Sequence, residues 1–280
     1  MATPDVAPIP KVNPWLTGIS VLAGTFMVIL DSTVVNVSLP YIAGNLSSTI
    51  EEATWVLTMY LAANAIIIPI TGWMANYFGR KRLLLLAVAG FTAASFFCGF
   101  ATSLTMLILF RVIQGVSGGV MQPLSQAIML ESFPPHERGQ AMAVWSLGIV
   151  VAPIFGPVLG GWLTDNYSWR WVFYINIPVG ILAMTMIRRF VFDPAYIRRG
   201  TAKIDYWGIL LMIAGVGALQ IALDQGQQED WLASRWITAI LVVAAVSLAG
   251  LLIRELLARS PIIDLRVFKE PTYTTGVALM

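Results

Sequence analysis

Charged and amide side chains stand inside segments that are otherwise apolar enough to cross a bilayer. Asp31 lies in the run V-I-L-D-S-T-V-V-N-V-S-L-P, and Arg111 lies in L-F-R-V-I-Q-G, where Gln114 follows three residues later on the same helical face. Placing a carboxylate or a guanidinium in the middle of a membrane helix costs about 2.5–3.5 kcal/mol on insertion scales, so such groups usually face a bundle interior or a water-filled cavity. Because burial disfavours the charged carboxylate, we expect Asp31 to bind and release protons near neutral pH.

Arg111 is the candidate partner of Asp31, because a guanidinium stays charged and requires a carboxylate, a carbonyl or water. Thr33 and Asn36 extend the polar patch around Asp31, and with Gln114 they are candidates for the lining of a polar cavity. Two simpler interpretations stay open. Asp31 can instead be held in a purely structural hydrogen-bond network, and Arg111 can lie close enough to a helix end to reach the membrane surface.

The segment W-S-L-G-I-V-V-A-P-I-F-G-P-V-L-G-G-W-L, residues 145–163, combines span-length hydrophobicity with many glycines and prolines. Ala152, Gly156 and Gly160 lie four residues apart, so one helix face has almost no side chain and a neighbouring backbone can come close. Each proline also removes one helical hydrogen bond. The segment is therefore either a tight packing seam or a hinge on which two halves of a transporter rock. Its gating candidates are Gly148, Pro153, Gly156, Pro157, Gly160 and Gly161.

The composition is that of a polytopic membrane protein, since 58% of the 280 residues are hydrophobic and only 11% are charged, against about 25% in soluble domains. Cys98 is the single cysteine and His136 the single histidine, which excludes an intrachain disulfide, a metal cluster built on histidines and a triad that needs a second histidine. No G-x-x-x-x-G-K loop occurs, so the chain carries no ATP motor of its own. We expect no metal, no cofactor and no nucleic-acid partner, and we do not expect an enzyme.

Eight apolar segments reach the length of about 20 residues that a membrane-crossing helix needs. We therefore predict an all-α fold with helices over residues 14–39, 53–75, 83–101, 104–130, 139–163, 169–187, 206–223 and 236–257. A ninth helix begins near Pro271, but the sequence stops at Met280, which leaves too few residues for a span. We therefore expect the chain to be part of a longer protein and to stop inside its ninth helix.

Loop charges predict the orientation, because positive residues gather on the cytoplasmic side of a membrane. If the eight helices alternate, 14 basic residues fall on one side and only Arg170 and Arg235 on the other. We therefore predict a multi-pass protein of the cytoplasmic (inner) membrane with a cytoplasmic N-terminus. The 14 residues are Lys11, Arg80, Lys81, Arg82, Arg138, Arg188, Arg189, Arg198, Arg199, Lys203, Arg254, Arg259, Arg266 and Lys269.

The segment G-W-M-A-N-Y-F-G-R-K-R-L, residues 72–83, resembles the signature of the major facilitator superfamily in the loop between its second and third helices. The basic cluster is the strongest part of the match, and Gly72, Gly79 and Arg80 are its gating candidates. The Asp that is usual at the fifth position is Asn76 here, which puts in doubt the charge-relay role that the resemblance gives this position. The segments L-F-R-V-I-Q-G and G-P-V-L-G-G resemble the superfamily's helix-four motif and the helix-five motif of its antiporters.

Two further segments narrow the resemblance. L-D-S-T-V-V-N-V-S-L-P in the first helix and W-R-W-V-F-Y-I-N-I-P-V-G in the sixth are similar to drug:proton antiporters of the ~14-helix EmrB/QacA type, as is the link P-I-I-D-L-R-V-F-K. The resemblance implies a major facilitator fold, with an N-terminal six-helix bundle over residues 1–190, a cytoplasmic linker over 191–205 and an extra helix pair over 206–258. Residues 259–280 would form a cytoplasmic link and the start of a second bundle.

The resemblance implies proton-coupled multidrug efflux across the cytoplasmic membrane, in which lipophilic or cationic compounds are exchanged for protons. Asp31 and Arg111 would couple the two movements. The implied partners are small-molecule drugs or lipophilic toxins, protons and membrane lipid, and also a periplasmic adaptor protein and an outer-membrane channel. The alternative is a facilitator-fold importer or an uncoupled carrier. A membrane-bound enzyme or receptor would need a catalytic constellation that the sequence does not contain.

Overall fold

The computed structural model of the chain describes residues 13–193, 205–258, 267 and 269–278. Every regular element in these ranges is a helix, which confirms the predicted all-α fold. The chain forms two compact units, Met1–Gly200 and Thr201–Met280. The expected linker over 191–205 falls mostly, and the expected link over 259–280 partly, outside the described residues. The same holds for six of the basic residues counted above, Lys11, Arg198, Arg199, Lys203, Arg259 and Arg266.

The helices of the described ranges alternate with short connections. The first unit holds α1 (Pro14–Asn45), α2 (Ile50–Phe78), α3 (Arg80–Phe100), α4 (Leu104–Ser132), α5 (Arg138–Asn166), α6 (Trp171–Tyr174) and α7 (Asn176–Phe190). The second holds α8 (Tyr206–Gln225), the 3-10 helix η1 (Trp231–Ala233), α9 (Arg235–Leu257) and α10 (Pro271–Ala278). Eight helical segments are long and apolar enough to cross a membrane, which confirms the eight predicted spans. Several extend beyond the predicted bounds because polar caps lie outside the apolar runs, as in the capping box that Thr49 and Glu52 form at the start of α2.

The sixth span, predicted over residues 169–187, runs from Trp171 to Phe190, and it is divided into α6 and α7 by the single residue Ile175, whose backbone stays helical with φ −59° and ψ −26°. Pro178 lies in the first turn of α7 and has no amide hydrogen to donate to the carbonyl of Tyr174, four residues earlier. The first part ends at Tyr174 and the second begins at Asn176, with Ile175 between them. The break places Asn176 at the start of a helix inside the unit, where its side chain is buried.

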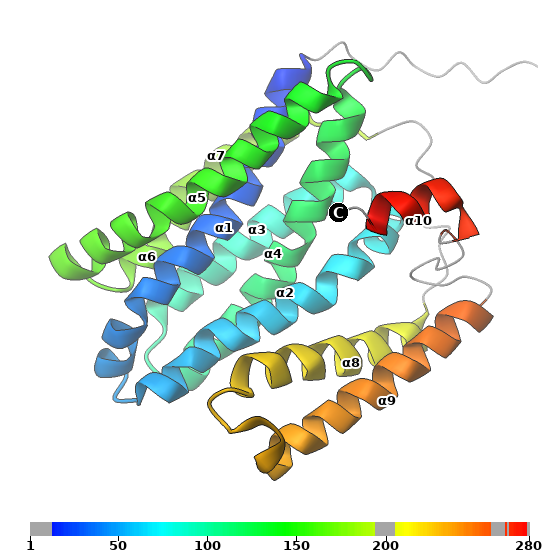
Figure 1. The fold of residues 1–280 in the computed structure, drawn as a ribbon. Coiled ribbons are helices and arrows are strands. Elements are labelled where there is room, and N and C mark those ends of the chain that lie inside the picture. The colour runs from blue at the N-terminus through cyan, green and yellow to red at the C-terminus, as the bar shows by residue number, and fades with distance from the viewer. Residues whose placement is uncertain (1–12, 194–204, 259–266, 268, 279–280) are drawn as a thin grey trace, which may run out of the picture. The chain divides into compact units, whose positions relative to one another are not determined.

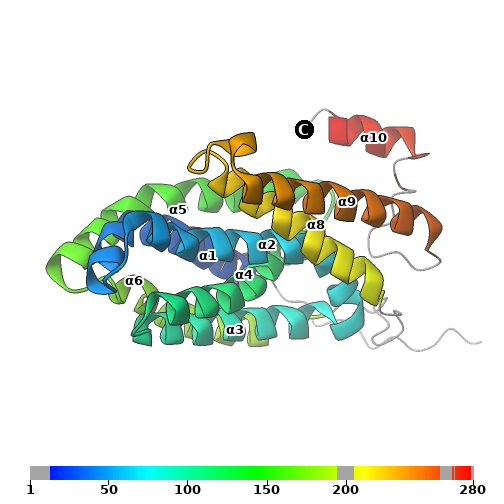
Figure 2. The same ribbon diagram turned by 90° about the horizontal axis from the view of Figure 1, so that it is seen from below.

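Pairs of helices pack along each other within the first unit. The main pairs are α2 with α4, α1 with α5, and α3 with both α4 and α7. Figure 1 shows α1 and α5 running side by side, and Figure 2 shows α3 running along α4. The described interior holds three apolar clusters, of which one includes Val28 and Phe91 and a second includes Leu30 and Phe173. Since Val28 and Leu30 are two residues apart on α1, these two clusters meet at the level of Asp31.

The small-residue face of α5 is turned toward α1 of the same unit. A Cβ atom on Gly156 would collide with Oγ1 of Thr33, and one on Gly160 would lie 2.9 Å from the carbonyl oxygen of Val34. A Cβ on Gly161, by contrast, would have no atom within 4 Å. The segment therefore has a packing partner in α1, and its role as a hinge stays a prediction.

The remaining gating candidates of α5 lie on more than one side of this helix. Gly148 faces α1, where an added Cβ would lie 2.7 Å from Leu22. Pro153 and Pro157 are exposed, and the helix runs through both of them from Arg138 to Asn166. The hydrogen bonds that the two prolines remove are therefore lost without a break in the helix.

The second unit is built on a hairpin of α8 and α9, which pack along each other. Gly215 lies against Leu248 of α9, where a Cβ would come within 2.9 Å of its side chain, so the hairpin depends on this small residue. Asp205 caps the first turn of α8 by accepting from the amide of Gly208 at 3.0 Å. The same carboxylate pairs with Nη2 of Arg254 on α9 at 2.9 Å, which joins the two helices at this end.

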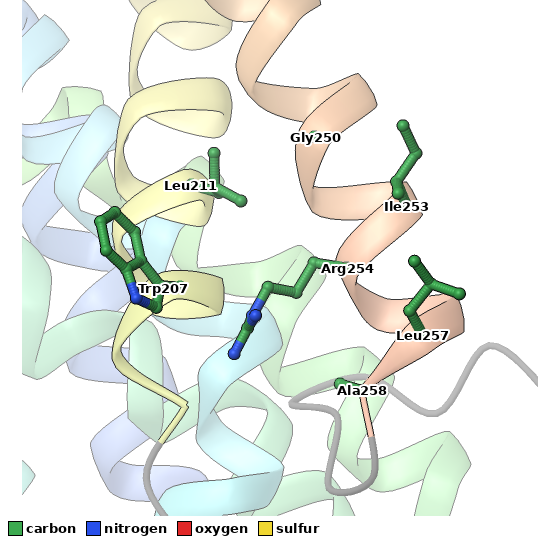
Figure 3. Close-up of a pocket in the computed structure, with 7 residues that line it drawn as sticks. All are labelled: Trp207, Leu211, Gly250, Ile253, Arg254, Leu257 and Ala258. Atoms are coloured by element: carbon green, nitrogen blue, oxygen red, sulfur yellow. The ribbon is translucent and has the colours of Figure 1, made fainter.

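An open groove lies beside this ion pair. In Figure 3, Arg254 reaches from α9 toward Trp207 of α8, and the remaining walls are apolar. Because the guanidinium of Arg254 is already paired with Asp205, the described lining offers no unpaired charge to a ligand. The lining residues are Trp207, Leu211, Gly250, Ile253, Arg254, Leu257 and Ala258.

Replacing Gly160 by Leu is expected to destabilise the first unit. The new side chain would meet the backbone of α1, and overpacking of this kind costs about 1–3 kcal/mol. Gly161→Leu is the matched control, because that position is open, and it should melt at the wild-type temperature. Thermal unfolding of the purified protein in detergent measures both variants, and equal melting temperatures would contradict the packing of α5 on α1.

The α8–α9 hairpin is expected to weaken in acid. Burial by itself would raise the pKa of the Asp205 carboxyl, but hydrogen bonds from Arg254 and from the amide of Gly208 outweigh it and hold this pKa below its usual value. Such a group stabilises the folded state above the unfolded pKa of about 3.9, and the stabilisation is lost as pH falls through the lower folded value. Hydrogen exchange at Gly208 should therefore lose protection only below about pH 4. Asp205→Asn should abolish this pH dependence, and an unchanged profile in that variant would refute the assignment.

Candidate functional site

Asp31 lies inside the first unit with 1% of its surface exposed, and three side chains donate hydrogen bonds to its carboxylate. Oδ2 accepts from Nη1 of Arg111 at 2.5 Å. Oδ1 accepts from Nε2 of Gln114 at 3.0 Å and from Nδ2 of Asn176 at 2.7 Å. Donors of this kind favour the carboxylate over the neutral acid, and the bond from the guanidinium is charge-assisted.

Arg111 is fully buried beside Asp31, so it does not reach the surface of the unit. Its Nε donates to the carbonyl oxygen of Val56 at 3.2 Å, and Nη1 also donates to Oε1 of Gln114 at 2.7 Å. Its Cζ lies 3.9 Å from the ring centroid of Tyr60, a cation–π arrangement. Nη2 has no hydrogen-bond partner within the part of the chain that the structure describes. The positive charge of Arg111 is therefore paired with Asp31, while its Nη2 makes no hydrogen bond to the described residues.

Two residues of α3 complete the network. Oγ of Ser95 lies 2.7 Å from Nε2 of Gln114 and 3.3 Å from Nδ2 of Asn176. Sγ of Cys98 lies 3.7 Å from Oε1 of Gln114. All four side chains are buried. The network thus joins α1, α3, α4 and α7 through side chains, and it reaches α2 through the carbonyl of Val56.

Thr33 and Asn36, the other polar candidates of α1, are not members of this network. The hydroxyl of Thr33 donates to the carbonyl oxygen of Leu30 at 2.9 Å, and its side chain lies against Gly156. Asn36 is exposed at the surface of the unit. Helix geometry explains the separation, since a turn of about 100° per residue puts both positions on faces other than that of Asp31. Their role in lining a cavity stays a prediction.

The loop between α2 and α3 holds the signature residues. Gly79 has a φ of 84°, a left-handed conformation that favours glycine, and it separates the end of α2 from Arg80 at the start of α3. Arg80 forms an ion pair with Glu131 near the end of α4. Gly72 and Asn76 are exposed on α2, and a Cβ on Gly72 would meet nothing within 4 Å. The structure therefore ties Arg80 to α4 and leaves Gly72 and Asn76 at the surface of this unit.

Sequence reasoning identified the pair of Asp31 and Arg111 and the nearby Gln114, but it missed Asn176 and Ser95. The available signal for Asn176 was an amide inside an apolar span, in the segment W-R-W-V-F-Y-I-N-I-P-V-G. Ser95 gave no signal, because a serine in a membrane helix commonly bonds only to its own backbone. Within the described ranges, no group of three or more His, Cys, Asp or Glu side chains could hold a metal ion.

Eight membrane-length helices, with an ion pair buried in the first unit, define a polytopic α-helical membrane protein. Residues 21–280 match the family model described as Major Facilitator Superfamily, and the chain belongs to that superfamily. The solved structure of the POT family transporter PepTSo shares the fold, with a TM-score of 0.59 over 88% of this chain and 52% of that one, at 17% identity. This confirms the predicted fold.

The most informative relatives are named as export and resistance proteins. The chain is 45% identical over 258 residues to the multidrug export protein EmrB of Escherichia coli strain K12, which covers 92% of this chain and 50% of that protein. It is 42% identical over 264 residues to the fatty acid resistance protein FarB of Neisseria gonorrhoeae, covering 94% and 51%. The resemblance to the EmrB/QacA type is thereby confirmed, and the chain spans about half the length of these relatives.

Removing only one partner of the buried ion pair is expected to be strongly destabilising. Arg111→Leu leaves the Asp31 carboxylate buried without its counter-charge, which typically costs about 3–5 kcal/mol. The double variant Asp31→Leu/Arg111→Leu removes both charges and should unfold at a higher temperature than Arg111→Leu alone. Thermal unfolding in detergent measures whether the double variant unfolds at a higher temperature than Arg111→Leu. Additive losses in the double variant would show that the two side chains do not interact.

Proposed function

We propose that this chain is part of a proton-coupled exporter, which moves lipophilic or cationic compounds across the cytoplasmic membrane in exchange for protons. The observation that carries the proposal is the buried Asp31 carboxylate, paired with Arg111 in a unit of membrane-length helices. The names of the relatives, a multidrug export protein and a fatty acid resistance protein, support small lipophilic substrates. On this proposal the chain performs transport and no enzymatic reaction.

Asp31 is the group that carries the proton. As a carboxylate it accepts bonds from Arg111, Gln114 and Asn176. A proton that adds to one of its oxygens removes the charge that Arg111 pairs with and turns that oxygen into a donor, so the surrounding donors no longer match it. Because only states with different affinities for the proton can be shifted by it, this mismatch biases the transporter toward a second arrangement. A cationic substrate would favour the carboxylate and so compete with the proton.

The α1–α5 contact is where we place the movement that follows. Thr33 connects the proton site to this contact, because it lies on the same helix as Asp31 and its side chain touches Gly156 of α5. Close backbone contacts without bulky side chains permit small sliding motions between helices. Asn36 is exposed on α1, so a substrate could reach it without opening the buried network.

The orientation and the protein partners belong to the same proposal. The distribution of basic loop residues supports a cytoplasmic N-terminus in the inner membrane. A periplasmic adaptor and an outer-membrane channel rest on the resemblance to the EmrB type. Gly215 is occupied by α9, so an adaptor helix would have to use the opposite, exposed side of α8, where Leu210 and Ile213 lie.

Asp31→Asn is expected to abolish export of cationic dyes and the accompanying movement of protons. Asn keeps the size of the side chain but cannot bind or release the proton. The measurement uses inverted membrane vesicles that contain the whole protein, in which addition of a cationic dye should release protons through the wild type. Dye accumulation and collapse of the pH gradient are followed together.

Asp165→Asn is the matched control, because this carboxylate on α5 bonds to Tyr41 at the helix ends and lies outside the network. It should keep both activities. Export by Asp31→Asn with the wild-type pH dependence would remove Asp31 from the mechanism. Dye export without any proton movement in the wild type would instead favour an uncoupled carrier.

A further inference from the structure

The break in the sixth span places an amide side chain against the proposed proton site. Asn176 is the first residue of α7, and it follows the interruption at Ile175. The backbone there lacks the bond from residue 178, which is a proline, to Tyr174. Membrane helices tolerate such a missing bond where neighbouring helices, polar side chains or ordered waters compensate for it.

The side chain of Asn176 makes such contacts across the interior of the unit. Its Nδ2 donates to Oδ1 of Asp31 on α1 at 2.7 Å and to Oγ of Ser95 on α3 at 3.3 Å. The orientation of the amide is fixed by chemistry, since a carboxylate oxygen can only accept. Among the described residues, the hydrogen bonds of this side chain are both made by Nδ2.

We propose that Asn176 is a positioning residue that links the charge of Asp31 to the break in the sixth span. This inference rests on the proposed function, because it requires Asp31 to change its protonation state during transport. While Asp31 is a carboxylate, the bond from Asn176 is charge-assisted and holds the start of α7 against α1. When Asp31 takes up a proton, this bond becomes an ordinary one and the break is held less firmly.

Gln114 cannot perform the same role, although it also donates to Asp31. Its Oε1 accepts from Arg111 at 2.7 Å, and both residues stand on α4, so the bond to Asp31 ties α1 to a continuous helix. Asn176 is the network residue that stands at an interrupted backbone. A change at Asp31 therefore reaches, through Asn176, the point where the sixth span lacks one backbone hydrogen bond.

Asp31 is faced by titratable and aromatic side chains from several helices. Arg111 faces it from α4, Tyr60 from α2 and Cys98 from α3, whereas α6 contributes the apolar ring of Phe173 near the guanidinium. The neutral donors come from α4 and α7. Arg111 stays charged throughout, so a shift on changing Asn176 reports the lost amide bond.

The test uses the purified whole protein in lipid nanodiscs and does not require transport. Infrared difference spectra give the pH midpoint of the Asp31 carboxyl, assigned by its loss in Asp31→Asn. Hydrogen exchange, corrected for the intrinsic effect of pH, gives the protection of residues 174–179. In the wild type, this protection should fall as pH drops through the carboxyl midpoint.

Asn176→Leu is similar in size and removes the donor. It should raise the carboxyl midpoint by about one pH unit, a tenfold gain in proton affinity. It should also leave residues 174–179 weakly protected at every pH. Asn176→Ser, which keeps a hydroxyl donor, should fall between this variant and the wild type, and it replaces Asn176→Leu if that variant does not insert.

The control is Asn166→Leu, the same substitution at an exposed amide at the end of α5, and it should match the wild type in both measurements. If Asn176→Leu also matches the wild type while Asp31 titrates normally, the role of Asn176 is refuted and the proposed function stands. If the infrared spectra of the wild type show no pH-dependent signal of the Asp31 carboxyl, the proposed proton coupling fails first, and the inference falls with it.

Discussion

The first unit depends on compensating one buried negative charge. A carboxylate in the apolar interior costs several kcal/mol unless it is paired and hydrogen-bonded. Asp31 obtains one guanidinium and two amides, and these come from α4 and α7. Each donor must reach a point where two apolar clusters meet, so the network sets how α1, α4 and α7 are placed. The arrangement of these helices is therefore tied to the hydrogen bonds of one side chain.

Glycines at the helix contacts let the helices around Asp31 approach each other closely. In lipid there is little hydrophobic gain from pairing two helices, so close approach and polar contacts decide which helices pair. Gly156 and Gly160 bring α5 onto α1, and on α4 a Cβ at Gly119 would lie 2.7 Å from the backbone oxygen of Asn64 on α2. The glycines of α4 share their helix with Arg111. The same helix thus provides both the charge that pairs with Asp31 and the flat surface that lets α2 cover it.

Membership of the superfamily establishes the fold, whereas the buried network is what supports the proposed function. The match over residues 21–280 and the shared fold establish the architecture. They do not by themselves assign a substrate, because superfamily folds host many activities. The proposed function rests on the site, in which a carboxylate accepts hydrogen bonds from a guanidinium that stays charged and from an amide at the junction of α6 and α7. On our proposal, this combination converts binding of a proton into a change of backbone contacts.

The sequence by itself determined the class, the eight spans and the core of the site, because long apolar runs and isolated charges within them have few physical solutions in a membrane. Asp31 and Arg111 could be expected to face the interior, yet only the tertiary structure brought them to 2.5 Å. The membership of Asn176 and Ser95, the break at Ile175 and the exclusion of Thr33 and Asn36 were also decided by tertiary structure. The physical reason is that helix periodicity gives the faces of each helix, but which faces meet depends on packing between helices far apart in the chain. Gly156 and Gly161 lie in one glycine-rich run, and only packing shows that the first touches α1 while the second does not.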